Sequence, residues 1–270
     1  MNSKRDFATC SDGTKIFFRI DGKENAPRVA LLHSLAMDHR FWRPVVERLA
    51  KDAIVLSIDC RGHGRSDISS APYSTDLFAR DLSEVMDHIG WRTATIAGAS
   101  MGGCVSLAFA SSFPDRTDAL GLFDTTAWYG PSASKDWALR ADKALAEGLG
   151  GLIDFQVTRW FSELFREQNP DVVRSCIDVF LANDLQAYSQ TCRMLGSHNV
   201  TDALPGISCA TTIVVGEEDY ATPIAMAQTL HQGIRNSRIM VVEKARHLTP
   251  LEVPEVIANE ISKLIGATRP

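Results

Sequence analysis

The chain has 270 residues, of which 45% are hydrophobic and 23% are charged, so its composition excludes a disordered tail, a collagen-like repeat and a disulfide-stapled miniprotein. A chain of this length can bury one sizeable core without metals or disulfides. Its 28 Lys and Arg residues against 33 Asp and Glu give a formal charge of −5, and no basic stripe is present that could neutralise a phosphate backbone, so we expect no nucleic-acid partner.

Short β-branched runs alternate with amphipathic stretches over the first half of the chain. Runs that are apolar on both faces are typical of buried parallel strands, whereas apolar residues spaced three and four apart predict helices. The expected strands are Lys15 to Ile20, Val29 to His33, Ile54 to Asp59, Thr93 to Ala97 and Leu120 to Phe123. The expected helices are Phe41 to Ala50, Asp76 to Ile89 and Gly103 to Ser112.

The pattern changes after Asp124. Residues 128 to about 200 have helical periodicity, no convincing strand and three of the five tryptophans, which predicts a helical insertion with its own small core. Strand and helix alternation returns with strands at 211–216 and Ile239 to Glu243 and helices at 225–233 and Pro254 to Ile265. This order predicts an α/β fold with a mostly parallel sheet, covered by helices on both faces, whose ligands bind beyond the carboxyl ends of the strands.

Membrane insertion and export are both disfavoured. No apolar run approaches the roughly 18 to 20 residues that span a bilayer, and the basic start of the chain leads into no apolar leader-like run. Six cysteines are scattered, with no C-x-x-C pair and no Cys/His cluster at zinc spacing. We therefore expect a cytoplasmic protein with reduced thiols, no bound metal and no membrane partner.

Residues 98–102 read G-A-S-M-G, between the strand T-A-T-I-A and a helical run. This placement predicts a nucleophile elbow, a tight turn in which Gly98 and Gly102 are small because the strand and the helix approach closely. Ser100 would project its hydroxyl into a cleft, and the Met101 amide at the helix N-terminus would point at a developing oxyanion. A simple glycine-rich turn is the alternative.

A serine nucleophile needs a base held by an acid, and on this type of turn the chain order is Ser, acid, His. Asp219 lies in G-E-E-D-Y-A-T-P, just past the strand at 211–216, and His247 lies in K-A-R-H-L-T-P, just past the next strand. His247 is the one histidine of seven that follows a late strand. Asp124, which follows the strand ending at Phe123, is a rival acid.

The second oxyanion donor should come from a loop after an early strand. The segment L-L-H-S-L-A-M-D at 31–38 fits, with the amide of Ser34 or Leu35 as the donor and His33 in a structural role. The segment D-C-R-G-H-G-R-S at 59–66 has the composition of a tight, hydrogen-bonded turn, and we interpret it as scaffold.

Together these motifs resemble those of the α/β-hydrolase fold superfamily, and the resemblance covers essentially the whole chain. Within it, three segments are similar to 3-oxoadipate enol-lactonases, namely H-S-L-A-M-D-H-R-F-W, L-Q-A-Y-S-Q-T-C-R-M-L and E-D-Y-A-T-P. The chain departs from that family in having His33 where asparagine is usual and Ala99 where leucine usually precedes the nucleophile.

The resemblance implies an eight-stranded, mostly parallel sheet with a helical cap inserted after the sixth strand. The core would comprise residues 1–125 and 201–270 and the cap residues 126–200. It also implies a triad of Ser100, Asp219 and His247, an oxyanion hole formed by the Leu35 and Met101 amides, and no cofactor.

The predicted function is hydrolysis of a small ester or lactone through an acyl-enzyme, with 3-oxoadipate enol-lactone of aromatic-compound degradation as the candidate substrate. A carbon-carbon bond hydrolase of dienoic acids is the nearest alternative, although such enzymes typically place tryptophan where this chain has Leu248. A general carboxylesterase and a non-enzymatic ligand receptor on the same fold also remain. The partner is a small molecule, and the sequence leaves open whether the chain forms a homo-oligomer.

An acidic lactone requires a cation in the pocket, because a dehydrated carboxylate is costly unless it is paired. The helical insertion offers Arg140, Arg159, Arg166 and Arg193. Arg159 is our first choice, against the alternative of a surface salt bridge. The candidate pocket aromatics are Trp128, Tyr129, Trp137, Trp160 and Tyr188, against the alternative that they form the core of the insertion.

Overall fold

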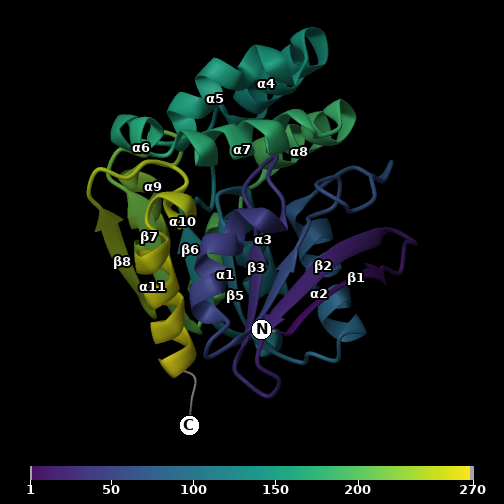
Figure 1. Ribbon diagram of the computed structural model, residues 1–270, viewed down its shortest axis with the longest axis vertical. Helices are drawn as coiled ribbons and strands as arrows, with labels where there is room; N and C mark the ends of the chain where they lie inside the picture. The colour runs from purple at the N-terminus through teal and green to yellow at the C-terminus, as the bar shows by residue number, and fades with distance from the viewer. Residues whose placement is uncertain (1, 268–270) are drawn as a thin grey trace.

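A computed structural model describes residues 2–267, and its strands join in one sheet in the order β1-β2-β4-β3-β5-β6-β7-β8 (Figure 1). Only β2 runs against the others, because it pairs antiparallel with both β1 and β4, while every pair from β4 to β8 is parallel. The strands are β1 (Asn2–Thr9), β2 (Lys15–Gly22), β3 (Arg28–Leu32), β4 (Ile54–Ile58), β5 (Ala94–Ala99), β6 (Thr117–Phe123), β7 (Ala210–Gly216) and β8 (Ser237–Val242).

Seven of these strands are expected from the sequence, with ends that differ by at most three residues. The sequence pattern does not predict the bounds of the eighth strand, β1, because N-S-K-R-D-F-A-T is largely polar and lacks the apolar pattern of a buried strand. It forms the edge of the sheet, where charged side chains are common because they discourage pairing with another chain.

Helices cover both faces of the sheet, as expected. Contacts between α1 and α11 define one layer, in front of the sheet in Figure 1, and contacts between α2 and α3 define the other. The covering helices are α1 (Arg43–Leu49), α2 (Thr75–His88), α3 (Met101–Ser112), α9 (Ile224–Gly233) and α11 (Pro254–Ala267). A four-residue helix, α10 (Thr249–Glu252), was not expected.

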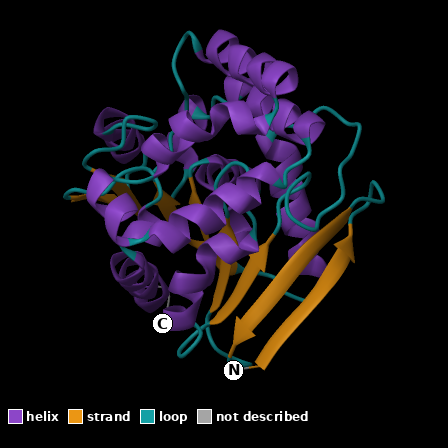
Figure 2. Ribbon diagram, turned by 45° about the horizontal axis from the view of Figure 1, so that its top comes forward, coloured by secondary structure: helices purple, strands orange, loops and turns teal. Residues whose placement is uncertain are grey.

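The chain between β6 and β7 is helical and lies over the end of the sheet to which β6 leads (Figures 1 and 2). Its helices are α4 (Ala133–Glu147), α5 (Ile153–Trp160), α6 (Glu163–Gln168), α7 (Pro170–Leu181) and α8 (Leu185–Ser197). The two segments that connect it to the sheet meet each other, because Trp128 and Asn199 form an isolated bridge and the Val200 amide donates to the Ala127 carbonyl. This arrangement confirms the expected helical insertion.

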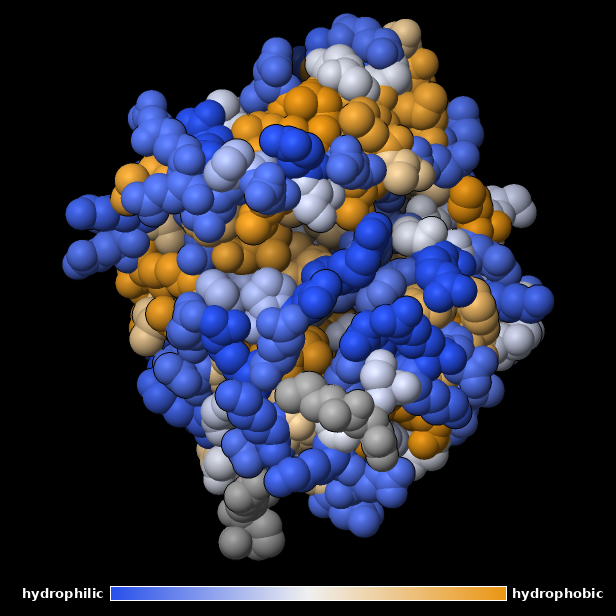
Figure 3. All heavy atoms as spheres, viewed as in Figure 1, coloured by the Kyte–Doolittle hydropathy of each residue, from blue (hydrophilic) through white to orange (hydrophobic). Residues whose placement is uncertain are grey.

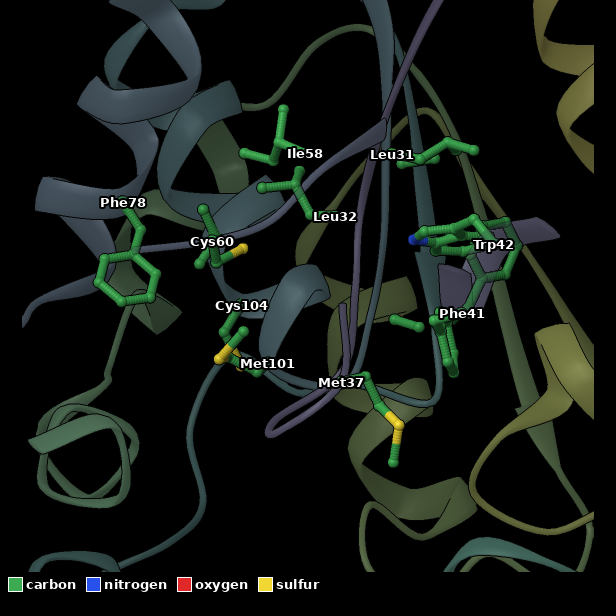
Figure 4. Packing of buried hydrophobic residues seen from close by; sticks show 14 of the residues in the cluster. Leu31, Leu32, Met37, Phe41, Trp42, Ile58, Cys60, Phe78, Met101 and Cys104 are labelled. Carbon is green, nitrogen blue, oxygen red and sulfur yellow. The ribbon is translucent and has the colours of Figure 1, made fainter. Parts of the chain in front are cut away.

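The apolar core lies between the sheet and its helices, and Figure 4 shows buried side chains from β3, β4 and α3 in one cluster. Helix α3 is buried nearly all round, so it has almost no amphipathic pattern. No helix among residues 2–267 is long and apolar enough to cross a membrane.

Two glycines allow α3 to start directly against the sheet. A Cβ atom added at Gly98 would lie 2.1 Å from the carbonyl oxygen of Gly102, and one added at Gly102 would lie 2.1 Å from the carbonyl oxygen of Leu32. Because these neighbours are backbone atoms of packed elements, they cannot move aside cheaply.

We expect Gly98→Ala to lower the free energy of unfolding by about 1 to 3 kcal/mol or more, because the methyl group overpacks the turn. Urea unfolding measures the change, with Gly206→Ala as the matched control, since a Cβ there meets nothing within 4 Å. Equal stability of the two variants would contradict the close-approach explanation.

Candidate active site

Ser100 occupies the turn between β5 and α3 in a conformation that a non-glycine residue rarely adopts. Its φ is +53°, a strained value that persists only where the surroundings enforce it. Its amide donates to the Phe123 carbonyl (2.9 Å), and its carbonyl accepts from the Thr125 hydroxyl (2.7 Å). The neighbouring strand β6 and the residues after it therefore hold the turn.

His247 follows β8 and lies between Ser100 and Asp219. Its Nε2 is 2.9 Å from Ser100 Oγ, and its Nδ1 is 2.8 Å from Asp219 Oδ2. An ionised carboxylate only accepts hydrogen bonds, so Nδ1 carries the ring proton and Nε2 is left to accept from the serine hydroxyl. All three side chains are at most 5% exposed.

Asp219 is held in its charged form. Burial opposes ionisation, yet the His247 ring and hydrogen bonds to Thr222 bring the pKa of Asp219 to about 2. The amides of Ala221 and Thr222 donate to its Oδ1, at 2.7 and 3.0 Å, and the Thr222 hydroxyl donates to its Oδ2 at 2.8 Å. Asp219 Oδ2 therefore accepts hydrogen bonds from both the Thr222 hydroxyl and the His247 imidazole.

Asp124, the rival acid, has different partners. Its carboxylate accepts from the Gly216 amide (3.1 Å) and from the amide and hydroxyl of Thr249 (2.9 and 2.7 Å), and no hydrogen bond joins it to His247. Burial and the nearby charge of Asp219 raise the pKa of Asp124 well above its ordinary value. Asp124 therefore ties the end of β7 to the chain just after His247.

The two expected oxyanion donors lie on segments that abut. Met101 begins α3, so its amide has no partner within the helix, and the Leu35 amide donates to no acceptor within the described residues. The contact of Gly102 with the Leu32 and His33 carbonyls brings the two segments together.

The loop after β3 is oriented by His33. The Cys60 amide donates to His33 Nε2 (2.9 Å), so Nδ1 carries the proton and donates to the Ser34 carbonyl (2.8 Å). Burial lowers the pKa of His33, which favours this neutral form. The ring is hydrogen-bonded within the loop, which agrees with a structural role.

Asp38, His39 and Asp59 come close enough to suggest a cation site, but protein donors already satisfy their carboxylates. Arg40 pairs with Asp38, and Asp59 accepts from the backbone and the ring of His39. These bonds fit the interpretation of residues 59–66 as scaffold.

A cavity of about 560 Å³ lies between the helical insertion and the loop that bears Asp219. Ala221, whose amide bonds Asp219, forms part of its wall, as does Tyr129, whose hydroxyl is 3.8 Å from the Sγ atom of Cys104 in α3. Leu139 and Phe155 also line it and are about half exposed. Figure 3 shows apolar side chains gathered over the helices at the top of the view.

Two arginines line this cavity, and neither has a carboxylate within 4 Å among the described residues. Arg140 donates to the Tyr188 hydroxyl (2.8 Å) and lies over the Trp137 ring. Burial and the charge of Arg140 lower the pKa of Arg159 to about 10. Two unpaired guanidinium groups in an apolar cavity suit an anionic ligand.

Of the side chains expected to contact substrate, Arg159, Tyr129 and Trp137 line the cavity, whereas Trp128, Trp160 and Tyr188 do not. Trp160 packs against Phe161 and Phe180 inside the insertion, Trp128 is 41% exposed at the connecting bridge, and Tyr188 is buried and reaches the cavity only through Arg140. Arg140 was not singled out from the four candidate arginines. The spacing of Trp137 and Arg140, one helical turn apart on α4, is the signal that favours it.

Comparison with known proteins agrees with this architecture. The family model for the alpha/beta hydrolase fold matches residues 27–254. The chain is 31% identical to 3-oxoadipate enol-lactonase 1 of Acinetobacter baylyi, over 92% of this chain and 91% of that protein. It is 27% identical to 3-oxoadipate enol-lactonase 2 of the same organism, over 90% of each chain.

Among solved structures, the enol-lactonase of Burkholderia xenovorans LB400 superposes with a TM-score of 0.92 at 31% identity, covering 97% of this chain and all of that one. A thermophilic esterase of Thermogutta terrifontis, with malate bound, superposes with a TM-score of 0.91 at 26% identity, over 99% of this chain and all of that one. The chain belongs to the alpha/beta hydrolase fold family, and it is a hydrolase.

Proposed function

We propose that the protein is a serine hydrolase that opens a small lactone bearing a free carboxylate, or cleaves a related ester, through an acyl-enzyme on Ser100. The observation that carries this proposal is the unbroken hydrogen-bond chain from Asp219 through His247 to Ser100 Oγ. The names of the similar enol-lactonases support the choice of a lactone, with 3-oxoadipate enol-lactone as the candidate.

In the first half of the reaction, Ser100 Oγ attacks the acyl carbon while His247 Nε2 takes its proton. Asp219 keeps the imidazole in the correct tautomer and stabilises its charged form. The amides of Leu35 and Met101 donate to the tetrahedral oxyanion, each contributing roughly 3 to 4 kcal/mol in comparable sites.

The first half ends when His247 protonates the leaving ring oxygen, the acyl C–O bond breaks and the acyl-enzyme forms. In the second half, the neutral His247 takes a proton from the water that attacks the acyl carbon, and it returns this proton to Ser100 Oγ as the acid is released. The leaving oxygen of a lactone stays tethered to the acyl group, so hydrolysis of the acyl-enzyme must outrun re-closure of the ring. A site that keeps the tethered alcohol away from the acyl carbon and lets water reach it favours hydrolysis.

The helical insertion, residues 126–200, acts in this proposal as a cap on the core formed by residues 1–125 and 201–270. In this proposal Arg159 from α5, with Arg140 from α4, pairs with the free carboxylate of the substrate in the cavity of about 560 Å³. The wall of that cavity reaches the acid loop at Ala221 but does not include Ser100, Asp219 or His247. The malate named in the structure of the similar esterase is a dicarboxylate, which supports an anionic ligand here.

Replacing the nucleophile tests the central assignment. We expect Ser100→Ala to remain folded and to lose roughly 10⁴- to 10⁶-fold in kcat, as removal of a triad member does in a related mechanism. Turnover of an activated ester measures the loss, and circular dichroism checks the fold. Activity within about tenfold of the parent would show that another residue is the nucleophile.

Substitution of Asp219 should lower kcat, whereas substitution of Asp124 should mainly lower stability. Asp219→Asn should lose on the order of 10⁴-fold in kcat, because the amide holds the imidazole in the wrong tautomer. Asp124→Asn should lose much less activity but lower the free energy of unfolding by roughly 1 to 3 kcal/mol, since its new NH₂ group must face the Gly216 or Thr249 donors. Steady-state kinetics and urea unfolding measure the two effects, and the reverse ranking in kcat would move the acid to Asp124.

A lactone with a free carboxylate should be hydrolysed with a higher kcat/KM than its methyl ester, and Arg159→Ala should remove much of this preference. A charge-assisted hydrogen bond is worth roughly 1.5 to 3 kcal/mol, so about 10- to 150-fold is at stake. Arg193→Ala is the control, because Arg193 is half exposed and pairs with Asp142 on the surface. A parent enzyme that prefers the methyl ester would point to a general esterase instead.

A further inference from the structure

The chain on both sides of His247 is bonded to the C-terminal end of α5 and the residue that follows it in the helical insertion. Arg246 Nη1 donates to the carbonyls of Thr158 (2.8 Å) and Phe161 (3.3 Å). The Leu248 amide donates to the Trp160 carbonyl (3.1 Å). The residues immediately before and after the base therefore both bond the insertion, although they lie some 90 residues away in the sequence.

Glu252 adds a third connection between the same two segments. Its Oε2 accepts from the Ser162 hydroxyl (2.7 Å), and its Oε1 accepts from the Arg246 amide (2.9 Å). Ser162 is the N-cap of α6 and is only 5% exposed, so the insertion fixes the orientation of its side chain. One carboxylate thus joins the start of α6 to the backbone next to His247.

Arg246 also bonds the loop that bears the acid. Its Nη2 donates to Glu218 Oε2 (2.8 Å), the residue before Asp219, and its side chain is only 19% exposed. The Glu218 side chain is 41% exposed, so this bond orients the Arg246 guanidinium more than it adds stability. The base, its acid and the insertion therefore share one hydrogen-bonded unit.

We propose that Arg246 and Glu252 are positioning residues that hold His247 against Ser100 by fastening its loop to residues 158–162 of the insertion. The inference rests on the proposed triad. It makes the insertion part of the machinery that places the base, beyond its contact with substrate. Because reacting groups lose about 100-fold in rate when misplaced by 1 Å, a small shift of this loop has a large effect.

The test measures how fast a fluorophosphonate labels Ser100, a reaction that needs the imidazole but no particular acyl group. We expect Glu252→Gln to slow labelling by about 10- to 100-fold, because its NH₂ group must face the backbone amide of Ser162 or of Arg246, and both amides only donate. Ser162→Ala, on the other side of the bond, should slow labelling several-fold. Glu255→Gln is the matched control and should label at the parent rate, since Glu255 is exposed and pairs with Arg48.

Two further measurements distinguish a role in positioning His247 from a general loss of structure around it. The double variant of Glu252→Gln and Ser162→Ala should label less slowly than the product of the two single effects predicts, because both changes weaken the same contact between Glu252 and Ser162. With a small neutral activated ester, both variants should lower kcat and leave KM within about twofold. Ser162→Ala decides the outcome if Glu252→Gln does not fold.

Parent-like labelling in both variants, or a rise in KM with unchanged kcat, would overturn the positioning role and leave the triad intact. A parent protein that the probe does not label at Ser100 would overturn the triad, and this inference with it. The two failures are therefore distinguishable in one experiment.

Discussion

The site exists only if the loops that bear Ser100, Asp219 and His247 meet at one place, and the parallel sheet brings them there. Ser100 follows β5, Asp219 follows β7 and His247 follows β8, and parallel strands deliver their carboxyl ends to the same edge. The positive φ of Ser100 and the backbone contacts of Gly98 and Gly102 hold Ser100 at that edge with almost no freedom. The strain stored there is held by the surrounding core rather than by the turn itself.

Electrostatics assigns different tasks to two buried carboxylates that the fold brings close together. Asp219 receives four hydrogen bonds, one of them from His247, and stays ionised, while burial and the neighbouring charge favour the neutral form of Asp124. Two neighbouring carboxylates in a low-dielectric region cannot both stay ionised unless enough hydrogen-bond donors surround them. Asp124 is thereby left to bond the end of β7 to Thr249, which steadies the segment that follows His247.

Much of this architecture could be predicted from the sequence, because buried parallel strands and the G-x-S-x-G turn leave strong local signals. The edge strand β1 could not, since its polar residues lack a buried pattern. The roles of residues in the insertion were also out of reach. Helical periodicity shows that a helix face is buried, but it does not show which residues cover that face. It therefore does not reveal that Trp160 lies in the core of the insertion or that Arg140 lines the cavity. The bonds of Arg246 and Glu252 link segments about 90 residues apart, which no local pattern reveals.

The account depends most directly on a covalent intermediate at Ser100. Rapid mixing with an activated ester should release a burst of leaving group equal to the enzyme concentration, followed by slower turnover. Mass spectrometry of the quenched protein should then find the acyl group on the peptide that contains Ser100. Turnover without a burst does not by itself contradict the account, because acylation can be the slow step. An acyl group on another residue, such as the neighbouring Cys104, would contradict it.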